Sequence, residues 1–337
     1  MRILVLLALV AIAIASPLQQ LWQYLTPSSY SINSVSVGNL TVVASSSPSS
    51  YSSGCFYILN KTDGKLLNTI CPPGGASSTS YANGTFALLS YDGYVYLLNE
   101  TTLNYSSVYI GTDYSYGIVL VPGGFVACYN GCAMFNYQGQ AEWNVTGLNV
   151  LSNPAFNGTA IFVPDSISSS VVILDLNGKK IGTPIQLPEM PWSVAACGEY
   201  LAVKAVGGLY LYDLSSSPTL LWIRNDLGSY GQVVFLGNCS YLVVGASTKL
   251  SLLNVDGKLL YQVTYPLTIK SVGWNLGLAI GFGDGTLYFY YLNTTELKTI
   301  TTLMTSNEAG APITPIPMIL PLAYFLYRKS DRLSRKR

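Results

Sequence analysis

An apolar residue followed by Asn or Asp recurs seven times along the chain at nearly constant spacing. The seven pairs are Leu59-Asn60, Leu98-Asn99, Phe135-Asn136, Leu174-Asp175, Tyr212-Asp213, Leu253-Asn254 and Leu292-Asn293. Successive polar members of these pairs lie 39, 37, 39, 38, 41 and 39 positions apart. A regular period of this length is typical of repeat proteins, in which each repeat forms one supersecondary unit.

The sixth repeat shows what each unit contains. Apolar and aromatic runs at 233–235, 241–245, 251–254 and 258–263 are separated by turns rich in Gly, Asn and Asp. Such runs are typical of short β-strands joined by hairpins, and four antiparallel strands per repeat are typical of a β-propeller blade. The sequence therefore predicts an all-β, seven-bladed β-propeller over about residues 20–305, with very little helix. The outer strand of the fourth blade is predicted at 180–185.

The recurring Asn or Asp closes the third strand of each predicted blade. A short polar side chain at this place accepts hydrogen bonds from backbone N–H groups two residues further on, and so holds the turn. Glycine follows at Gly64, Gly139, Gly178 and Gly257, where the turn requires a positive φ. We therefore interpret these residues as builders of the turn and not as a functional site.

Two segments resemble the quinoprotein-like repeat of seven-bladed propellers. They are Gly283-Asp284-Gly285-Thr286-Leu287-Tyr288 and the segment 253–260. In the family's pattern, a glycine-aspartate turn precedes the third strand and an aspartate-x-x-glycine-lysine turn follows it. Leu21-Trp22 and Leu221-Trp222 are similar to the leucine-tryptophan of that family's fourth strand. The resemblance covers most of residues 20–303 and implies the propeller fold. In this family the N-terminal strand often completes the last blade, so 21–25 competes with 297–303 for that place.

The same resemblance raises the question of a cofactor. Quinone-dependent members hold their cofactor with calcium-bound acids and with stacked aromatic and cysteine neighbours, whereas this chain has no adjacent cysteines. Its acids cannot be matched to such a cluster, and it has no histidine to serve as metal ligand or general base. We expect no cofactor, no metal and no catalytic residue. The alternative is an extracellular hydrolase or quinone-type oxidoreductase with its site on the propeller axis.

The two ends of the chain predict its location. Residues 1–15 combine a basic start, an apolar run and a small-residue exit, which is typical of a secretory signal peptide. Residues 306–327 hold a stem and an uncharged apolar segment, and the basic tail 328–337 follows directly, as in a stop-transfer, positive-inside pattern. Four prolines in this segment count against a regular helix. The sequence predicts a single-pass membrane protein whose propeller, residues 16–305, lies outside the cell.

Charge and acceptor motifs agree with an exterior location. Residues 16–327 hold 10 Lys/Arg and 15 Asp/Glu, and this acidic body argues against nucleic-acid binding. The sparse charge suits the hot, acidic surroundings of an archaeal envelope, and we expect stability to change little between pH 7 and pH 3. Nine Asn-X-Ser/Thr motifs are candidate glycosylation sites, at Asn39, Asn60, Asn83, Asn99, Asn104, Asn144, Asn157, Asn238 and Asn293.

The six cysteines form an even set, as disulfides in an oxidising compartment require. Cys55 and Cys71 lie on the two arms of one predicted hairpin, and Cys128 and Cys132 flank a tight turn. Cys197 and Cys239 precede equivalent strands of neighbouring blades, where the distance between blades tests the reach of a disulfide. Six cysteines can be joined into three disulfides in fifteen ways. The repeat favours the set made of these three pairs.

Aromatic residues are abundant, with 26 Tyr and 5 Trp. Most alternate within predicted strands, but Tyr114, Tyr116, Trp192, Tyr230 and Tyr265 fall in connections between blades, near the ring face where propellers bind partners. Tyr and Trp suit both protein interfaces and sugars, although ordinary packing of loops also accounts for them. We predict a non-enzymatic scaffold of the cell envelope that binds a protein or glycan. The comparison with propeller proteins that assist envelope assembly is an analogy of fold alone. A structural subunit of a surface layer is a third possibility.

Overall fold

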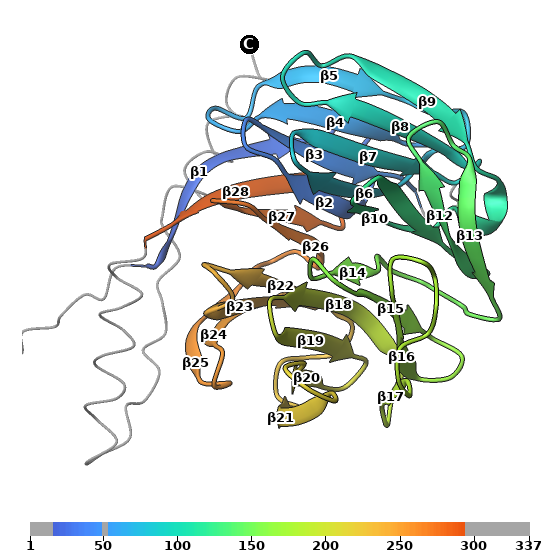
Figure 1. Ribbon diagram of the computed structural model, residues 1–337. Coiled ribbons are helices and arrows are strands. Elements are labelled where there is room, and N and C mark those ends of the chain that lie inside the picture. Colours follow the sequence, from blue (N-terminus) through green and yellow to red (C-terminus); the bar gives the residue numbers. More distant parts are fainter. Residues whose placement is uncertain (1–15, 49–52, 294–337) are drawn as a thin grey trace, which may run out of the picture. The chain divides into compact units, whose positions relative to one another are not determined.

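The computed structural model describes residues 16–48 and 53–293, so the predicted signal peptide, stem, membrane segment and tail lie outside the described residues. In the described part the strands form seven four-stranded antiparallel sheets (Figure 1). The prediction of seven four-stranded blades is therefore confirmed. The only helix among these residues is the single 3-10 turn η1 (Thr112–Tyr114), which agrees with the low helix content expected.

The strands of each blade follow one another from the axis outward. Blades 1 and 2 contain β2 (Ile32–Val37), β3 (Thr41–Ser46), β4 (Cys55–Asn60), β5 (Leu66–Ile70), β6 (Ala76–Ala82), β7 (Thr85–Ser90), β8 (Tyr94–Asn99) and β9 (Tyr105–Tyr109). Blades 3 and 4 contain β10 (Gly117–Val121), β11 (Gly124–Cys128), β12 (Gly131–Asn136), β13 (Ala141–Thr146), β14 (Ala155–Phe156), β15 (Ile161–Asp165), β16 (Ser170–Leu174) and β17 (Ile185–Gln186). Blades 5 and 6 contain β18 (Pro191–Cys197), β19 (Tyr200–Ala205), β20 (Leu209–Asp213), β21 (Thr219–Arg224), β22 (Gly231–Leu236), β23 (Tyr241–Ala246), β24 (Lys249–Asn254) and β25 (Leu259–Thr264). Blade 7 contains β26 (Ile269–Trp274), β27 (Leu278–Phe282), β28 (Thr286–Leu292) and β1 (Leu18–Leu25).

The seven blades close into a ring. The innermost strands contact one another in the order β2, β6, β10, β14, β18, β22 and β26, and β26 contacts β2 again; Figure 1 shows them around the middle of the ring. The N-terminal strand β1 is the outer strand of blade 7 and pairs with β28, from Leu18 opposite Leu292 to Leu25 opposite Thr286. The competition for this place is therefore decided for the N-terminal strand, and the rival segment 297–303 lies outside the described residues.

The apolar core lies between neighbouring blades. One cluster joins Trp22 and Phe289 of blade 7 to Val42 and Leu59 of blade 1, and another joins blades 4 and 5. Phenylalanines of the second and third strands are fully buried, at Phe56, Phe86, Phe125, Phe162 and Phe282. Because each sheet buries both faces against its neighbours, the axis of the ring is left to the edges of the innermost strands.

The recurring Asn and Asp residues hold the turns that follow the third strands. Their Oδ1 atoms accept backbone hydrogen bonds two residues on, from Gln138 to Asn136 at 3.0 Å and from Ser215 to Asp213 at 2.8 Å. The glycine of the turn has a positive φ, for example 77° at Gly178. The role predicted for this motif is therefore confirmed at these turns.

Tryptophans of the outer strands tie three blades to their neighbours. The indole Nε1 of Trp143 in blade 3 donates to the carbonyl of Leu176 in blade 4 at 2.8 Å, and its ring lies against Gly178 of the same turn. Trp22 and Trp222 make the same pair of contacts, at Lys61 and Gly64 and at Val255 and Gly257. Only glycine leaves room for the ring, because a Cβ on Gly178 would lie 2.5 Å from Trp143.

Blade 4 departs from the predicted strands. The outer strand expected at 180–185 is wrong: Lys180 makes one isolated bridge to Leu174, and the strand β17 covers only Ile185–Gln186. Gly182 between them has a φ of 62°, and Pro184 has no N–H to donate to the ladder. These two residues interrupt the strand.

Three disulfides join Cys55 to Cys71, Cys128 to Cys132 and Cys197 to Cys239, the three pairs that the repeat favoured. The third links blade 5 to blade 6, with its Cα atoms 5.6 Å apart, which is within the usual reach of about 4.4–6.8 Å. Turns of neighbouring blades therefore approach closely enough to be bridged. Among residues 16–48 and 53–293, no helix has the length and apolar character needed to cross a bilayer.

Candidate binding site at one mouth of the channel

The direction of the strands gives the ring two distinct faces. Each innermost strand runs from one face to the other, and the next three strands alternate in direction because all pairs are antiparallel. One face carries the connections that lead into the innermost strands and the connections that join second to third strands. We call it the cavity face. The opposite face carries the connections from first to second and from third to fourth strands.

Hydroxyl groups line the channel between the two faces. The Thr79 backbone N–H donates to Ser34 Oγ at 3.1 Å, and the Leu120 N–H donates to Ser80 Oγ at 3.0 Å. The Val233 N–H donates in the same way to Ser193 Oγ at 3.3 Å. An innermost strand has no partner strand on its axial side, so hydroxyls of the neighbouring blade satisfy its backbone groups. This explains why the innermost strands β2 and β6 are rich in Ser and Thr.

Asn153 joins three blades inside the channel. Its Oδ1 accepts hydrogen bonds from Ser78 Oγ and from the Ile118 N–H, and its Nδ2 donates to the carbonyl of Thr79 at 3.1 Å. It precedes β14, which is only two residues long. The side chain therefore replaces part of the contact that a longer innermost strand would make, and sequence analysis did not identify it.

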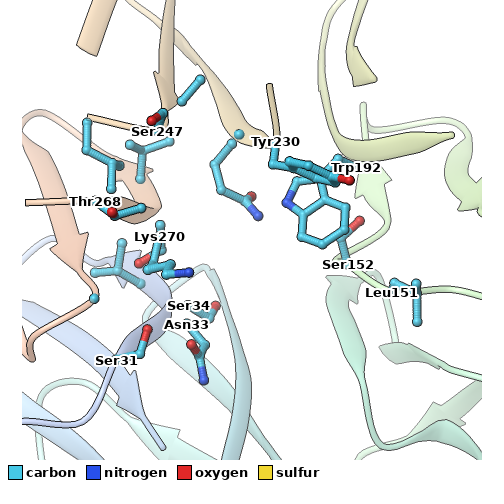
Figure 2. Close-up of a pocket in the computed structure, with 18 of the residues that line it drawn as sticks. Ser31, Asn33, Ser34, Leu151, Ser152, Trp192, Tyr230, Ser247, Thr268 and Lys270 are labelled. Carbon is cyan, nitrogen blue, oxygen red and sulfur yellow. The ribbon is translucent and has the colours of Figure 1, made fainter. Parts of the chain in front are cut away.

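A cavity of about 1130 Å³ opens at the cavity face, and we call it the first mouth. Nearly half of the residues in its wall are Ser, Thr, Asn or Gln, many of them at the starts of the innermost strands. Figure 2 shows Ser31, Asn33, Ser34 and Lys270 on one side of the open space and Trp192, Tyr230 and Ser152 on the other. Residues more than 230 positions apart in the chain thus share one wall.

Three of the five predicted ring-face aromatics line the first mouth: Tyr116, Trp192 and Tyr230. The rings of Trp192 and Tyr230 meet edge to face with centroids 5.0 Å apart. Tyr116 stacks on Tyr129 with centroids 5.5 Å apart. The structure therefore brings these residues of blades 3, 5 and 6 to one cavity, and their role in binding remains a prediction.

The other two predicted aromatics do not line the cavity. Tyr114, at the end of η1, packs edge to face against Phe135. Tyr265 lies between blades 6 and 7, and its hydroxyl donates to the Tyr290 hydroxyl at 3.0 Å. Burial raises the pKa of both Tyr265 and Tyr290. These positions match the alternative interpretation of packing, because a connection can turn inward without a signal in the sequence.

Few charged groups reach the first mouth. Asp226 is held by Arg224, with Oδ1 2.8 Å from Nε and Oδ2 2.5 Å from Nη2, and this side-chain hydrogen bonding lowers the pKa of the carboxyl. Lys249 and Lys270 also line the cavity and form no ion pair with any described residue. The cavity is therefore neutral over most of its wall with a modest excess of positive charge.

The described residues offer little for catalysis at either mouth. Asp226 is the one carboxylate among those that line the two mouths, whereas glycoside hydrolysis by the usual route needs a pair of carboxylates. No three His, Cys, Asp or Glu side chains of the described part are grouped to hold a metal ion. All six cysteines are in disulfides, so none is a free thiol beside a cofactor.

The nine glycosylation motifs avoid the cavity face. Four Asn residues lie in turns between first and second strands: Asn39, Asn83, Asn157 and Asn238. Another four lie at the end of a third strand or in the segment that follows it: Asn60, Asn99, Asn104 and Asn293. These eight therefore lie at the opposite face, and Asn144 is on the outer strand β13 at the perimeter. None of the nine is buried.

A smaller cavity of about 620 Å³ opens at the opposite face and forms the second mouth. It is lined by the ends of the innermost strands, among them Val37, Tyr81 and Trp274. Asn238, one of the glycosylation motifs, is part of this lining. A glycan at Asn238 would therefore compete with a partner for the second mouth.

The fold and the cavity together define a seven-bladed β-propeller with an aromatic, mostly neutral pocket on its axis. No protein family profile matches the sequence, and no curated protein is similar to it. Among solved structures, the chain is similar to BamB from Moraxella catarrhalis, with a TM-score of 0.59 and 12% sequence identity, over 81% of this chain and 99% of that one. At this identity the likeness shows the fold, and the site must be judged on its own residues.

Proposed function

We propose that the protein is an exported, non-enzymatic binding scaffold of the cell envelope, which holds a protein or glycan partner on its cavity face. The observation that carries this proposal is the uneven distribution of the glycosylation motifs between the two faces. Eight of nine glycosylation motifs lie at the opposite face and none at the cavity face, where the larger pocket displays Trp192 and Tyr230. A face kept bare of glycans and furnished with aromatic residues is suited to binding.

The rival function, an enzyme on the propeller axis, requires acids that converge at one end of the channel. Asp226 is the one carboxylate on the described walls of the mouths, and Arg224 already holds it. The chemistry of the pocket therefore favours recognition over hydrolysis.

The proposal includes the predicted anchor. Leu18 and Leu292 pair with each other at the opposite face, so the described chain begins and ends on that side of the ring. A membrane segment at 306–327, preceded by its stem, would be connected to the ring through the opposite face. Ser16 and Asn293, the first and last described residues, are therefore on the side away from the connections of the cavity face.

Crosslinking in the native membrane tests the proposal. A lysine-reactive crosslinker is applied to the tagged full-length protein, and captured partners and linked residues are identified by mass spectrometry. We expect a stoichiometric partner linked to Lys249 and Lys270, which lie at the first mouth. Links confined to Lys65, Lys179 and Lys258, in turns of the opposite face, would contradict the proposal. Recovery of the propeller with neither an enriched protein nor an enriched glycan would also contradict it.

A further inference from the structure

Tyr230 lies at the rim of the first mouth in a backbone conformation that tyrosine seldom adopts. Its φ is 46°, in the left-handed region that strains bulky residues. Its side chain is 53% exposed, so burial in a core does not offset that strain. Strained residues of this kind are concentrated at ligand-binding sites. The backbone N–H of Tyr230 donates to the Val206 carbonyl at 3.2 Å, which helps to hold the ring where it is.

Trp192 completes an aromatic pair with Tyr230. The two rings lie edge to face at an interplanar angle of 78°, and they come from neighbouring blades 5 and 6. Figure 2 shows both rings beside the open space of the cavity. The C–H face of a sugar ring packs well against such a pair, because aromatic rings provide an apolar surface with a polar tip.

Two hydroxyl groups of the same cavity lack hydrogen-bond partners. Ser31 Oγ and Ser152 Oγ are shielded from solvent, and neither has a partner among the described residues. An unsatisfied buried hydroxyl costs about 1–3 kcal/mol, and each such group calls for an explanation. Rotation about χ1 would turn each hydroxyl into the cavity that its residue lines, where a ligand rich in hydroxyl groups would satisfy it.

The charge of the cavity selects among such ligands. Lys270 projects toward the open space from the side across from Trp192 and Tyr230 (Figure 2), and Lys249 lies on the same rim. Neither lysine is ion-paired to a described residue, and the charge of Asp226 is compensated by Arg224. A carboxylate on the ligand would find these two cations available.

We propose that the first mouth is a binding site for an acidic oligosaccharide, one that contains uronic acid residues. A sugar ring packs on Tyr230 and Trp192, and its carboxylate lies toward Lys270. Its hydroxyl groups bond Ser31 and Ser152 once these side chains turn into the cavity. The cavity of about 1130 Å³ exceeds the usual range of about 300–1,000 Å³ for small-ligand pockets, which suits a chain of several sugars. This inference rests on the proposed function and names the class of ligand for the same face.

Calorimetric titration of the full-length chain in detergent tests the site, with trigalacturonate and its neutral counterpart galactotriose as probes. We expect saturable binding of one trigalacturonate per chain and at least a tenfold preference for it over galactotriose. Tyr230→Asn is expected to weaken binding at least tenfold while the loop is kept, because Asn tolerates the left-handed region. Lys270→Ala is expected to remove the preference for the acid, and salt to reduce it.

Tyr109→Asn is the matched control. Tyr109 is an exposed tyrosine in an aromatic pair with Tyr94, but it lies on the outer strand β9 away from the cavity. Its substitution is expected to leave binding unchanged. The inference is overturned by absence of trigalacturonate binding, by equal binding of galactotriose, or by unchanged binding in Tyr230→Asn. If a partner still crosslinks to Lys249 and Lys270 in those cases, the binding face stands, and only the ligand class or the placement of the ligand at Tyr230 is wrong.

Discussion

Lys204 in β19 has a fully buried side chain. Its Nζ donates to the carbonyl of Ala205 at 2.7 Å and to that of Val206 at 3.5 Å. Burial lowers the pKa of this amine from 10.5 to about 8, and the nearby Glu189 opposes the shift. Because the folded state binds the proton less tightly than the unfolded state, Lys204 reduces stability at neutral pH.

The lowered pKa of Lys204 predicts the direction of a pH effect. Between pH 8 and 10 the unfolded chain keeps the proton that the folded chain has lost, so the free energy of unfolding rises with pH. We expect the wild type to gain about 2 kcal/mol between pH 7 and 10 relative to Lys204→Met. Urea titrations at both pH values measure the difference. Parallel behaviour of the two proteins would show that the amine is charged in the folded state.

Single residues were predictable from sequence where the repeat itself specifies them. Asn136 and Asp213 hold their turns because the same short polar side chain is needed in every blade. The aromatic residues between blades were not predictable in this way. Trp192 lies on β18 and not in the connection expected for it, and it reaches the cavity together with Tyr230. Tyr265 packs between blades, and the course of an irregular connection decides where Tyr230 and Tyr265 point.

At the scale of the structural element, the turn of blade 4 carries a test of the tryptophan contacts. Gly178 has a φ of 77°, which strains any residue with a Cβ. A Cβ at this position would also lie 2.5 Å from the ring of Trp143. Gly182, a few residues further along, has a φ of 62° and no atom within 4 Å of such a Cβ. The two glycines therefore separate backbone strain from the loss of packing.

We expect Gly182→Ala to lower the free energy of unfolding by about 1 kcal/mol, which is the cost of a left-handed alanine. Gly178→Ala is expected to cost about 3 kcal/mol, because displacement of the Trp143 ring adds to the same strain. Chemical denaturation of both variants measures the two values. Equal losses would mean that the Trp143 contact does not stabilise the junction of blades 3 and 4.

The strands of most blades were predictable because apolar runs alternate with Gly, Asn and Asp turns. Blade 4 was not, since the apolar character of 180–185 concealed the effect of Gly182 and Pro184 on the ladder. The identity of the outer strand of blade 7 could not be decided from the sequence for another reason. Both 21–25 and 297–303 have strand-like patterns, and only the pairing of β1 with β28 distinguishes them.

At the scale of the whole molecule, the sparse charge predicts tolerance of acid. The chain has no histidine, and the carboxyls with lowered pKa, Asp63, Asp213 and Asp226, are held by hydrogen bonds at or near the surface. Stability that such groups contribute is lost as the pH falls through their folded pKa values, but surface groups contribute little. We expect the denaturation midpoint to change little from pH 7 to pH 3. A steep loss over this interval would contradict this expectation.

The gathering of the glycosylation motifs on one face becomes visible only when each motif is assigned to its strand or turn within the blade. Eight motifs follow a first or a third strand, and this phase within the repeat places them all on the opposite face. The phase was present in the sequence, but its meaning depends on the alternating direction of the strands. The depth of the first mouth could not be foreseen, because it depends on how closely seven innermost strands approach one another.

A glycan added to the cavity face tests the central claim most directly. Ile167→Asn creates an acceptor ahead of Ser168 and Ser169, at a residue that is 81% exposed in a turn of the cavity face. Gln138→Thr is the matched control, because it makes Asn136 an acceptor in a turn of the opposite face. Both variants are expressed in the native host, and mass spectrometry verifies that the new site carries a glycan.

The measured quantity is the amount of partner recovered by crosslinking capture from each variant. We expect the glycan at position 167 to reduce recovery at least tenfold and the glycan at Asn136 to leave recovery unchanged, since bulk on the cavity face blocks access to the first mouth. Equal recovery from Ile167→Asn and the wild type, with the site glycosylated, would contradict the account. Loss of the partner in Gln138→Thr alone would assign binding to the opposite face.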